Sequence, residues 1–300
     1  MKYKILKKNK NLLSKICIGT AQFGNVYGIA NKTHKFSLSE GIKLKRILNK
    51  YSIKSFDTAA DYGESEKILG KIGVKDFNII TKLPSKIPKK NVFDWVIKCI
   101  NKSLKKLKIN SLYGILIHDT KYLRGNKGLI LYQSLVHLKK IGIVKKIGIS
   151  IYNMEELNSI LPRYKIDLVQ APYNVFDQRL ELSGWMTKLK RFKIEIHARS
   201  PFLQGLLLME QNERPKKFNK WNKIFNIWHK KMRQSKISPL AACLSFVFSN
   251  RKIDKIVLGI DNAKQFVDII NLRMTKKIST RKLSIKNKSF LINPSKWKLL

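Results

Sequence analysis

Long apolar stretches are missing from this sequence of 300 residues. No run approaches the roughly 18 uncharged apolar residues of a membrane-spanning helix, so the sequence predicts none. The N-terminal segment reads MKYKILKKNKNLLSK, which is charged throughout and lacks the apolar centre of a secretory signal. The three cysteines, Cys17, Cys99 and Cys243, are odd in number, far apart and without the spacing of metal ligands. We therefore expect a cytoplasmic protein without a metal site.

Acidic residues are also scarce. There are 19 Asp and Glu against 62 Lys and Arg, which gives a formal net charge of +43 and a sequence pI near 10.2. Such a charge suggests a nucleic-acid or membrane-surface partner. However, Lys far outnumbers Arg, which is the better residue for phosphate recognition, and Ile and Asn are abundant alongside Lys. A codon-level drift towards A and T would produce this combination, so we interpret the charge as a solvated surface.

Apolar residues make up 44% of the chain, enough to bury a core. Eight short apolar runs alternate with longer segments that carry helical spacing of apolar residues, such as 92–107. Eight parallel βαβ units in a chain of this length predict a single (β/α)8 barrel over residues 1–300. Two three-layer α/β domains are the alternative, but no linker rich in Pro, Gly or Ser divides the chain. The eight runs are 15–19, 52–57, 77–82, 112–118, 144–150, 166–171, 193–198 and 255–259.

Two segments fall outside this repeat. The interval 211–250 is long enough to hold an extra helix besides the regular one. Residues 274–300 are rich in Lys and Ser and predict a basic tail, either a peripheral extension over the barrel or a partly mobile end.

Polar residues end several of the apolar runs, where a (β/α)8 barrel carries its active site. Asp57 ends the second run, and Tyr62 lies in the loop that follows. Lys82 ends the third run and His118 the fourth. A tyrosine beside a lysine suits a general acid, because the ammonium lowers the pKa of the phenol from its ordinary value near ~10. Asp57 would supply the counter-charge that a buried Lys82 needs. With His118 orienting a carbonyl through a hydrogen bond, these are the parts for reducing a carbonyl by hydride, provided that a nicotinamide lies beside them.

Seven short motifs follow one another along the chain: GTAQFG (19–24), FDTAADYGESEKILG (56–70), TK (81–82), LIHD (116–119), GIS (148–150), QAPYN (170–174) and SPFLQG (200–205). In this order they resemble the aldo-keto reductase superfamily, over about residues 16–271. The D-x-A-x-x-Y-G-x-S-E run that begins at Asp57 is the most specific, whereas the short motifs gain weight from their order and strand placement. The opening segment 19–31 resembles bacterial members often associated with the sugars of surface polysaccharides.

The resemblance implies a function and a set of residue roles. It implies a nicotinamide dinucleotide, usually NADPH, bound without a Rossmann fold, so the absence of a G-x-G-x-x-G motif is no objection. Tyr62 would be the proton donor, Asp57 and Lys82 would tune it, and His118 would complete a catalytic tetrad. For the cofactor, the implied contacts are Thr20 and Asp57 near the nicotinamide ribose, Ser150 and Gln170 at the carboxamide, Ser200, Phe202 and Gln204 near the pyrophosphate, and Gly259 and Gln265 near the adenosine.

Three positions depart from the family pattern. Ile151 stands where members commonly have an Asn that holds the carboxamide, so that hydrogen bond must be missing or supplied elsewhere. Arg199 stands where many members stack a Tyr under the nicotinamide, and its guanidinium could stack there but would bring charge. Gln265 stands where members that prefer NADPH often have an Arg for the 2′-phosphate. The preference for NADP(H) over NAD(H) is therefore slight, with Lys264 and Lys252 as substitutes for that Arg.

Three functions are carried forward. The leading one is an oxidoreductase of an aldehyde, ketone or sugar carbonyl, with a sugar derivative as a plausible substrate. A cofactor-binding regulatory module without turnover is the first alternative, and the tetrad argues against it. A basic nucleic-acid-binding protein is the second, resting on charge alone. The aromatic segment 221–229 (WNKIFNIWH) resembles a nucleic-acid surface, but its spacing is equally that of an amphipathic helix packed on a barrel, which we favour.

Overall fold

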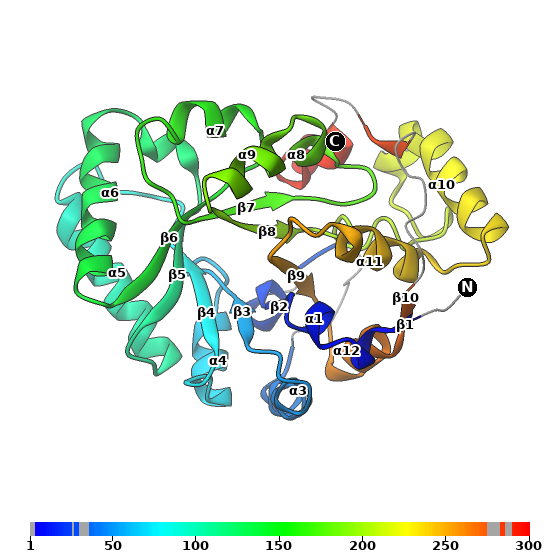
Figure 1. The fold of residues 1–300 in the computed structure, drawn as a ribbon, viewed down its shortest axis with the longest axis horizontal. Coiled ribbons are helices and arrows are strands. Elements are labelled where there is room, and N and C mark those ends of the chain that lie inside the picture. Colours follow the sequence, from blue (N-terminus) through cyan, green and yellow to red (C-terminus); the bar gives the residue numbers. More distant parts are fainter. Residues whose placement is uncertain (1–3, 26, 30–35, 275–282, 286–289) are drawn as a thin grey trace.

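The computed structural model describes residues 4–25, 27–29, 36–274, 283–285 and 290–300. Eight parallel strands close into a barrel in which each strand pairs with the next along the chain, and β9 returns to pair with β2 (Figure 1). Each of the eight apolar runs overlaps one strand, so the predicted (β/α)8 fold is confirmed. The barrel strands are β2 (Ile16–Gly19), β3 (Ser55–Asp57), β4 (Asn78–Lys82), β5 (Leu112–Ile117), β6 (Val144–Ser150), β7 (Leu168–Pro172), β8 (Glu195–Arg199) and β9 (Lys255–Gly259).

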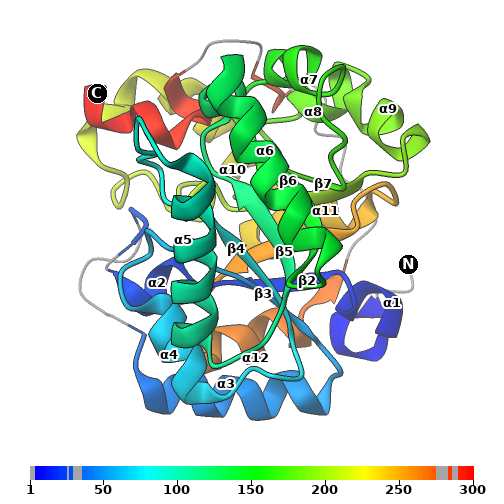
Figure 2. The same cartoon turned by 90° about the vertical axis from the view of Figure 1, so that its left-hand side faces the viewer.

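Helices surround the barrel, and Figure 2 shows α5 and α6 lying side by side along one outer face. None of the helices formed by the described residues is long and apolar enough to cross a membrane. The helices that connect consecutive strands are α3 (Leu38–Lys50), α4 (Ser65–Ile72), α5 (Val92–Leu107), α6 (Gly125–Lys140), α7 (Glu155–Ile160), α9 (Trp185–Arg191), α11 (Pro239–Ser249) and, after β9, α12 (Ala263–Asn271). Short helical turns precede some of them: α2 (Ala21–Gly24), η2 (Thr120–Leu123), α8 (Arg179–Leu182) and η3 (Lys216–Trp221).

Local sequence signals set where several helices begin and end. The side chain of Ser37 accepts a hydrogen bond from the backbone N–H of Glu40 at the start of α3. Ser238 begins α11 in the same way, and Asn262 begins α12. These residue types satisfy the free N–H groups of a helix N-terminus best. Gly73 ends α4 with φ at 78°, in the left-handed region that favours glycine.

A second sheet of two strands joins the two ends of the barrel sequence. β1 (Lys4–Ile5) pairs antiparallel with β10 (Arg273–Met274), which follows α12. A short helix, α1 (Lys10–Leu13), leads from β1 towards β2, and the Lys15 ammonium donates to the carbonyl of Asn250 (3.3 Å). The segment therefore lies at the end of the barrel where the strands begin. Strands of two residues carry no periodic pattern, and the sequence did not predict this sheet.

The barrel interior has an apolar layer beneath its C-terminal end. This layer is a buried cluster separate from the larger core between strands and helices. Side chains of alternate residues point into the barrel. The polar residues at the C-terminal ends of the strands therefore lie next to this apolar layer, on the side of the barrel mouth. Its members come from five strands: Cys17, Ile80, Leu116, Leu168 and Val257.

The interval between β8 and β9 holds an extra helix, as the sequence predicts. This helix is α10 (Asn222–Gln234), and it precedes the regular α11. Phe225 and Trp228 are fully buried, and the Trp228 indole N–H donates to the carbonyl of Leu207 (2.9 Å). Residues 222–229 thus belong to an amphipathic helix packed on the barrel, Trp221 ends the turn η3 before it, and the rings of Phe225 and Trp228 are not available for stacking on bases.

The described part of the C-terminal tail packs against this extra region. η5 (Phe290–Ile292) and η6 (Pro294–Leu299) form its turns. The Trp297 ring meets Phe218 edge-on at 5.0 Å between ring centres, and the Lys217 ammonium donates to the Trp297 carbonyl (2.8 Å). The parts of the predicted tail 274–300 that lie outside the described residues are 275–282 and 286–289.

We expect Trp297→Ala to lower the free energy of unfolding by about 3 kcal/mol, because it empties a buried site against Phe218. Leu299→Ala is the matched control, since that side chain is 75% exposed and its loss should change little. Chemical denaturation of the two variants measures the difference. Equal, small effects would mean that the tail adds nothing to the stability of the barrel.

Candidate active site

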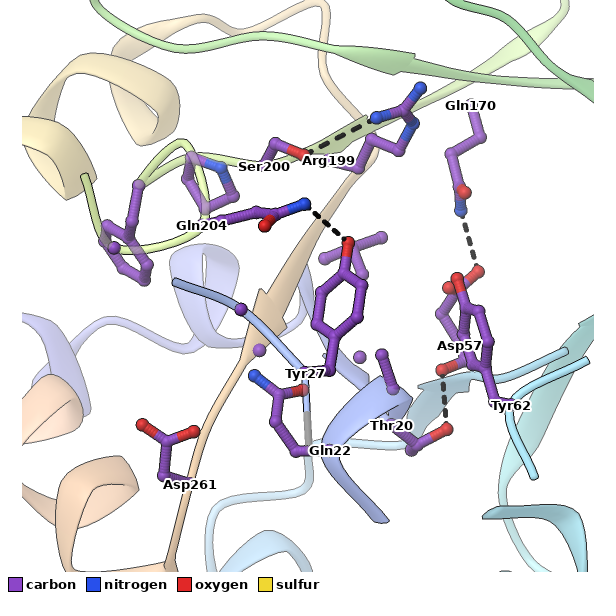
Figure 3. Close-up of a pocket in the computed structure, with 18 of the residues that line it drawn as sticks. Thr20, Gln22, Tyr27, Asp57, Tyr62, Gln170, Arg199, Ser200, Gln204 and Asp261 are labelled. Atoms are coloured by element: carbon purple, nitrogen blue, oxygen red, sulfur yellow. Dashed lines mark hydrogen bonds between the residues drawn. The ribbon is translucent and has the colours of Figure 1, made fainter. Parts of the chain in front are cut away.

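One pocket at the end of the barrel where the strands finish gathers the whole predicted tetrad and every predicted cofactor contact apart from the substitutes Lys264 and Lys252. Figure 3 shows many of these side chains directed into that pocket. They come from the ends of the strands and the loops after them, which is where a barrel of this class carries function. The predicted residues that line it are Thr20, Asp57, Tyr62, Lys82, His118, Ser150, Gln170, Ser200, Phe202, Gln204, Gly259 and Gln265.

A buried ion pair lies at the centre of the pocket. The Lys82 ammonium donates to Asp57 Oδ1 (2.6 Å) and to the carbonyl of Thr58 (2.9 Å). Both charged side chains are at most 4% exposed. Burial is the largest single cause and lowers the pKa of Lys82, but the charges and hydrogen bonds of Asp57 and Tyr62 together outweigh it and hold that pKa above its ordinary value. The lysine is therefore a permanent cation at working pH.

Gln170 and Thr20 hold Asp57 in place by hydrogen bonds, and Ser65 supports Thr20. The Gln170 amide donates to Asp57 Oδ2 (2.7 Å), and the Thr20 hydroxyl donates to the Asp57 carbonyl (3.0 Å). The Ser65 hydroxyl in turn donates to Thr20 Oγ1 (2.7 Å). Both carboxylate oxygens thus have a partner, which is the condition under which a buried charge is tolerated.

The loop after β3 carries Tyr62 and is held against the segment after β2. A Cβ added to Gly24 would lie 1.7 Å from the Tyr62 carbonyl oxygen, so only glycine allows this approach. The Tyr62 N–H donates to the carbonyl of Ala59 (3.0 Å). The phenol lies over the ion pair, with the Lys82 ammonium 5.0 Å from its ring centre.

The net effect on the Tyr62 phenol differs from the sequence expectation. Lys82 does lower the pKa of Tyr62, as expected, but burial is the larger cause and raises it above the ordinary value. The expectation that Lys82 brings this pKa down towards working pH is therefore wrong for the protein alone. A raised pKa keeps Tyr62 protonated, which is the form that a proton donor requires.

His118 stands edge-on to Tyr62, with 6.4 Å between the ring centres and 82° between the ring planes. Burial, followed by the charge of Lys82, lowers the pKa of His118 to about 4. Its Nδ1 is buried and has no hydrogen-bond partner among the described residues. The ring is therefore a neutral imidazole at pH 7, able to donate one hydrogen bond to a carbonyl oxygen.

A strained turn after β8 forms one wall of the pocket. The Gln204 amide donates to the Tyr27 hydroxyl (3.1 Å), which joins this turn to the segment after β2 (Figure 3). Left-handed backbone at non-glycine residues costs roughly 1–3 kcal/mol each and clusters at ligand clamps. The residues with positive φ are Ser200 (57°), Leu203 (49°), Gln204 (54°) and Gly205 (90°).

Two of the three positions that depart from the family pattern, Ile151 and Arg199, contact each other. The Ile151 side chain is fully buried, and its carbonyl accepts a hydrogen bond from Arg199 (3.1 Å). The Arg199 guanidinium lies over the Tyr152 ring, 4.2 Å from its centre. Both Arg199 and Tyr152 line the pocket. The pocket therefore carries a cation beside the tetrad.

The far end of the pocket, away from Tyr62 in Figure 3, carries a carboxylate. Asp261 and Gln265 line it, and the Gln265 side chain accepts a hydrogen bond from the Asp261 N–H (2.7 Å). Neither Lys264 nor Lys252 is among the described residues that line the pocket. Lys252 instead donates to Thr187 Oγ1 (2.7 Å).

The pocket fits an elongated polar ligand with a reacting group at one end. Its empty space is about 1220 Å³ including the open mouth. His118 Nδ1 and Arg199 Nε lie buried around the reacting end, and no described residue hydrogen-bonds to either atom. A dinucleotide whose nicotinamide meets Tyr62 would extend towards Asp261. The chemistry at hand is proton donation to an oxygen that gains negative charge.

The pocket residues that were not singled out in the sequence include Tyr27, Tyr152 and Asp261. Tyr152 lies two residues after Ser150, and Asp261 lies two residues after Gly259. Ser150 and Gly259 each end a strand, so extending the sequence search into the loop after each strand would have found Tyr152 and Asp261.

Comparisons with known proteins agree with the fold. The sequence model of the Aldo/keto reductase family matches residues 15–286. A search of curated proteins gives no match.

Solved structures with the same fold are distant in sequence. The aldo-keto reductase AKR11C1 of Bacillus halodurans has a TM-score of 0.70 and 14% identity, over 90% of this chain and 89% of its own. The glycerol dehydrogenase AKR11B4 of Gluconobacter oxydans has a TM-score of 0.68 and 18% identity, over 89% of each chain. A Pseudomonas aeruginosa protein described as an aldo-keto reductase has a TM-score of 0.59 and 17% identity, over 86% of this chain and 88% of its own. At these identities the likeness shows the fold alone.

We expect the His118 imidazole to remain neutral until the pH approaches about 4, because burial disfavours its charged form. Histidine NMR titration measures this, with His118→Gln identifying the signal by its loss. The signal should keep its neutral shift between pH 8 and pH 5, chosen to span the ordinary histidine value of roughly 6.5. A midpoint near that ordinary value would contradict the burial argument.

Proposed function

The chain belongs to the aldo/keto reductase family, and from this premise we propose that it transfers hydride between a nicotinamide dinucleotide and an aldehyde, ketone or sugar carbonyl, with Tyr62 as general acid. The observation that carries the proposal is the buried Asp57–Lys82 pair beneath a protonated Tyr62, with His118 beside it. A nicotinamide cofactor supplies the hydride in this chemistry.

The proposed proton step follows from the charges around Tyr62. As the carbonyl carbon is reduced, its oxygen gains negative charge and takes the phenol proton. The phenolate that remains is stabilised by the Lys82 ammonium, whose own proton is retained because Asp57 and Tyr62 together hold its pKa high. Neutral His118 directs its N–H at the same oxygen and orients the carbonyl.

The proposed cofactor contacts follow the length of the pocket. Gln170 and Ser150, 1% and 4% exposed, lie at the buried reacting end and suit the nicotinamide carboxamide. Gly259 and Gln265 suit the adenosine, together with Asp261. The contacts proposed between them, for the ribose and the pyrophosphate, are those of Thr20, Asp57, Ser200, Phe202 and Gln204.

The substrate class and compartment are narrower proposals. A sugar derivative is favoured by the resemblance of the opening segment 19–31, of which 26 and 30–31 lie outside the described residues. The positive surface would also attract phosphorylated or nucleotide-linked sugars. A cytoplasmic location is supported by the three cysteines, which are all free thiols.

The alternatives have weaker support. A regulatory module without turnover needs the cofactor pocket but not the ion pair beneath Tyr62, so it leaves the tetrad unexplained. A nucleic-acid-binding function rests on the net charge of +43, and the inward packing of Phe225 and Trp228 removes two of its aromatic candidates.

The residues at the far end of the pocket favour NAD(H), against the slight preference for NADP(H) taken from the sequence. An acidic side chain suits the 2′-hydroxyl of NAD(H), whereas a 2′-phosphate calls for a cation such as Arg. Among the described residues that line the pocket, the cations are Lys82 and Arg199, both beside Tyr62. Asp261 supplies the acidic side chain at the other end.

Tyr62→Phe should lower kcat at least 100-fold while the dissociation constant of the cofactor changes only a few-fold, because the phenol proton acts in the reaction and not in binding. The assay is oxidation of NADH or NADPH with a panel of aldehydes, ketones and sugars, with cofactor binding followed by tryptophan fluorescence.

Tyr51→Phe is the matched control, since it removes a phenol that does not line the pocket, and its turnover should equal that of the wild type. Unchanged turnover in Tyr62→Phe would exclude the proposed mechanism. Tight cofactor binding by the wild type without turnover of any carbonyl would favour the regulatory module.

Asp261→Asn should improve NADPH binding several-fold relative to NADH, because it removes a negative charge near the expected position of the 2′-phosphate. Asp268→Asn makes the same charge change at an exposed position of α12 outside the pocket and should leave the ratio unaltered. Fluorescence titration with both cofactors gives the two dissociation constants. A wild type that binds NADPH more than tenfold tighter than NADH would contradict the preference for NAD(H).

A further inference from the structure

Arg199 is fixed in the pocket by contacts that leave its charge unneutralised. Its guanidinium stacks on Tyr152 at 4.2 Å and donates to the Ile151 carbonyl (3.1 Å), and it lies 3.5 Å from Ser200 Oγ. Its Nε is buried and has no hydrogen-bond partner within the part of the chain that the structure describes. Among the described residues it forms no ion pair with any carboxylate. An aromatic face and carbonyl oxygens hold a guanidinium in place, but neither carries a compensating negative charge.

The other ionisable groups at the reacting end cancel. Lys82 and Asp57 form a contact pair with no net charge. Burial, the largest cause in each case, keeps Tyr62 protonated and His118 neutral, and the positive charge of Arg199 also lowers the pKa of His118. Arg199 is therefore close enough to act electrostatically on both residues. Among the described residues that line this end of the pocket, Arg199 therefore carries the one positive charge without a carboxylate in contact, whereas Asp61, which also acts on His118, lies exposed outside the lining.

Hydride transfer requires the nicotinamide ring to lie beside the carbonyl that Tyr62 and His118 hold, and hence near Arg199. The ring is a cation in the oxidised cofactor and neutral in the reduced one. We propose that Arg199 makes the site select the reduced cofactor, by repelling the oxidised nicotinamide across the pocket. This inference rests on the proposed function, because it requires the nicotinamide to bind beside Tyr62.

The ratio of the dissociation constants of NAD⁺ and NADH isolates the effect of Arg199 on the nicotinamide ring. The pyrophosphate, the riboses and the adenine are the same in both redox states, so their contacts with the turn after β8 and with Asp261 cancel in the ratio. What remains is the difference between a cationic and a neutral ring in a partly enclosed pocket with a fixed cation. We expect the wild type to bind NADH about tenfold tighter than NAD⁺. For a two-electron couple, a tenfold ratio raises the potential of the bound cofactor by about 30 mV.

Selection of the reduced cofactor would affect the order in which cofactor and substrate bind and leave. Reduced cofactor would be retained until a carbonyl arrives, and the oxidised product would leave more readily because its ring and Arg199 repel each other. The charge is held firmly, because Arg199 ends β8 in register with Pro172 of β7 and its carbonyl accepts the N–H of Tyr173 (3.1 Å).

The test compares three variants by isothermal titration with NADH and NAD⁺. Arg199→Met removes the charge and keeps a long side chain, Arg199→Lys keeps the charge, and Arg191→Met removes a charge from an exposed position outside the pocket. The ratio of the dissociation constants of NAD⁺ and NADH should fall from about ten to near one in Arg199→Met. It should stay within about threefold of the wild type in Arg199→Lys and Arg191→Met.

The outcomes separate the inference from the proposed function. An unchanged ratio in Arg199→Met would overturn the inference, as would an equal loss of affinity for both redox states, which indicates a structural role only. If Arg199→Met changes only the turnover of carbonyl substrates that carry a carboxylate, Arg199 recognises the substrate instead, and the inference is likewise wrong. Failure of the wild type to bind either cofactor would contradict the proposed function itself.

A measurement on the wild type alone covers the case in which Arg199→Met does not fold. ADP-ribose has the phosphates and the adenosine but lacks the nicotinamide. If the cationic ring is repelled, NAD⁺ should bind no tighter than ADP-ribose, whereas NADH should bind several-fold tighter. Tighter binding of NAD⁺ than of ADP-ribose, by as much as that of NADH, would overturn the inference without any variant.

Discussion

The buried ion pair between Lys82 and Asp57 is the interaction on which the rest of the site depends. Removing two charges from water is costly, and the cost is tolerated here because the pair is in contact at 2.6 Å and each partner has further hydrogen bonds. Lys82 also binds the Thr58 carbonyl, and Asp57 accepts from Gln170. The pair thereby joins β3 and β4 to β7 across the barrel. Loss of either partner would leave an unpaired buried charge, which costs about 3–5 kcal/mol.

The same pair sets the electrostatics of the pocket. Because Lys82 and Asp57 cancel, the reacting end owes its net charge to Arg199, which has no carboxylate partner among the described residues. The far end carries the carboxylate of Asp261. A ligand that spans the pocket therefore meets the Arg199 guanidinium at one end and the Asp261 carboxylate at the other. Under the two proposals, Arg199 affects whether the cofactor binds in its oxidised or its reduced form. Asp261 affects whether the cofactor carries a 2′-phosphate on its adenosine ribose.

The net charge of +43 acts at longer range. Lysines spread over a surface raise the capture rate of anionic ligands, increasingly so at low salt, because the field is screened within about 10 Å at 0.1 M. A dinucleotide or a phosphorylated sugar would be drawn to such a surface before any specific contact forms. The same field would attract nucleic acid without sequence preference, so binding of that kind would describe the surface and not the site.

The sequence by itself determined the eight strands and predicted the polar residues that meet in the pocket at their ends, because hydrophobic periodicity is local and the polar residues that end strands stand out against it. It could not determine the pairing of β1 with β10, since strands of two residues carry no periodic signal. Nor could it give the stacking of Arg199 on Tyr152 or the net direction of the Tyr62 pKa shift. Those depend on which side chains meet across the closed barrel and on how far water is excluded, and only the tertiary structure decides both.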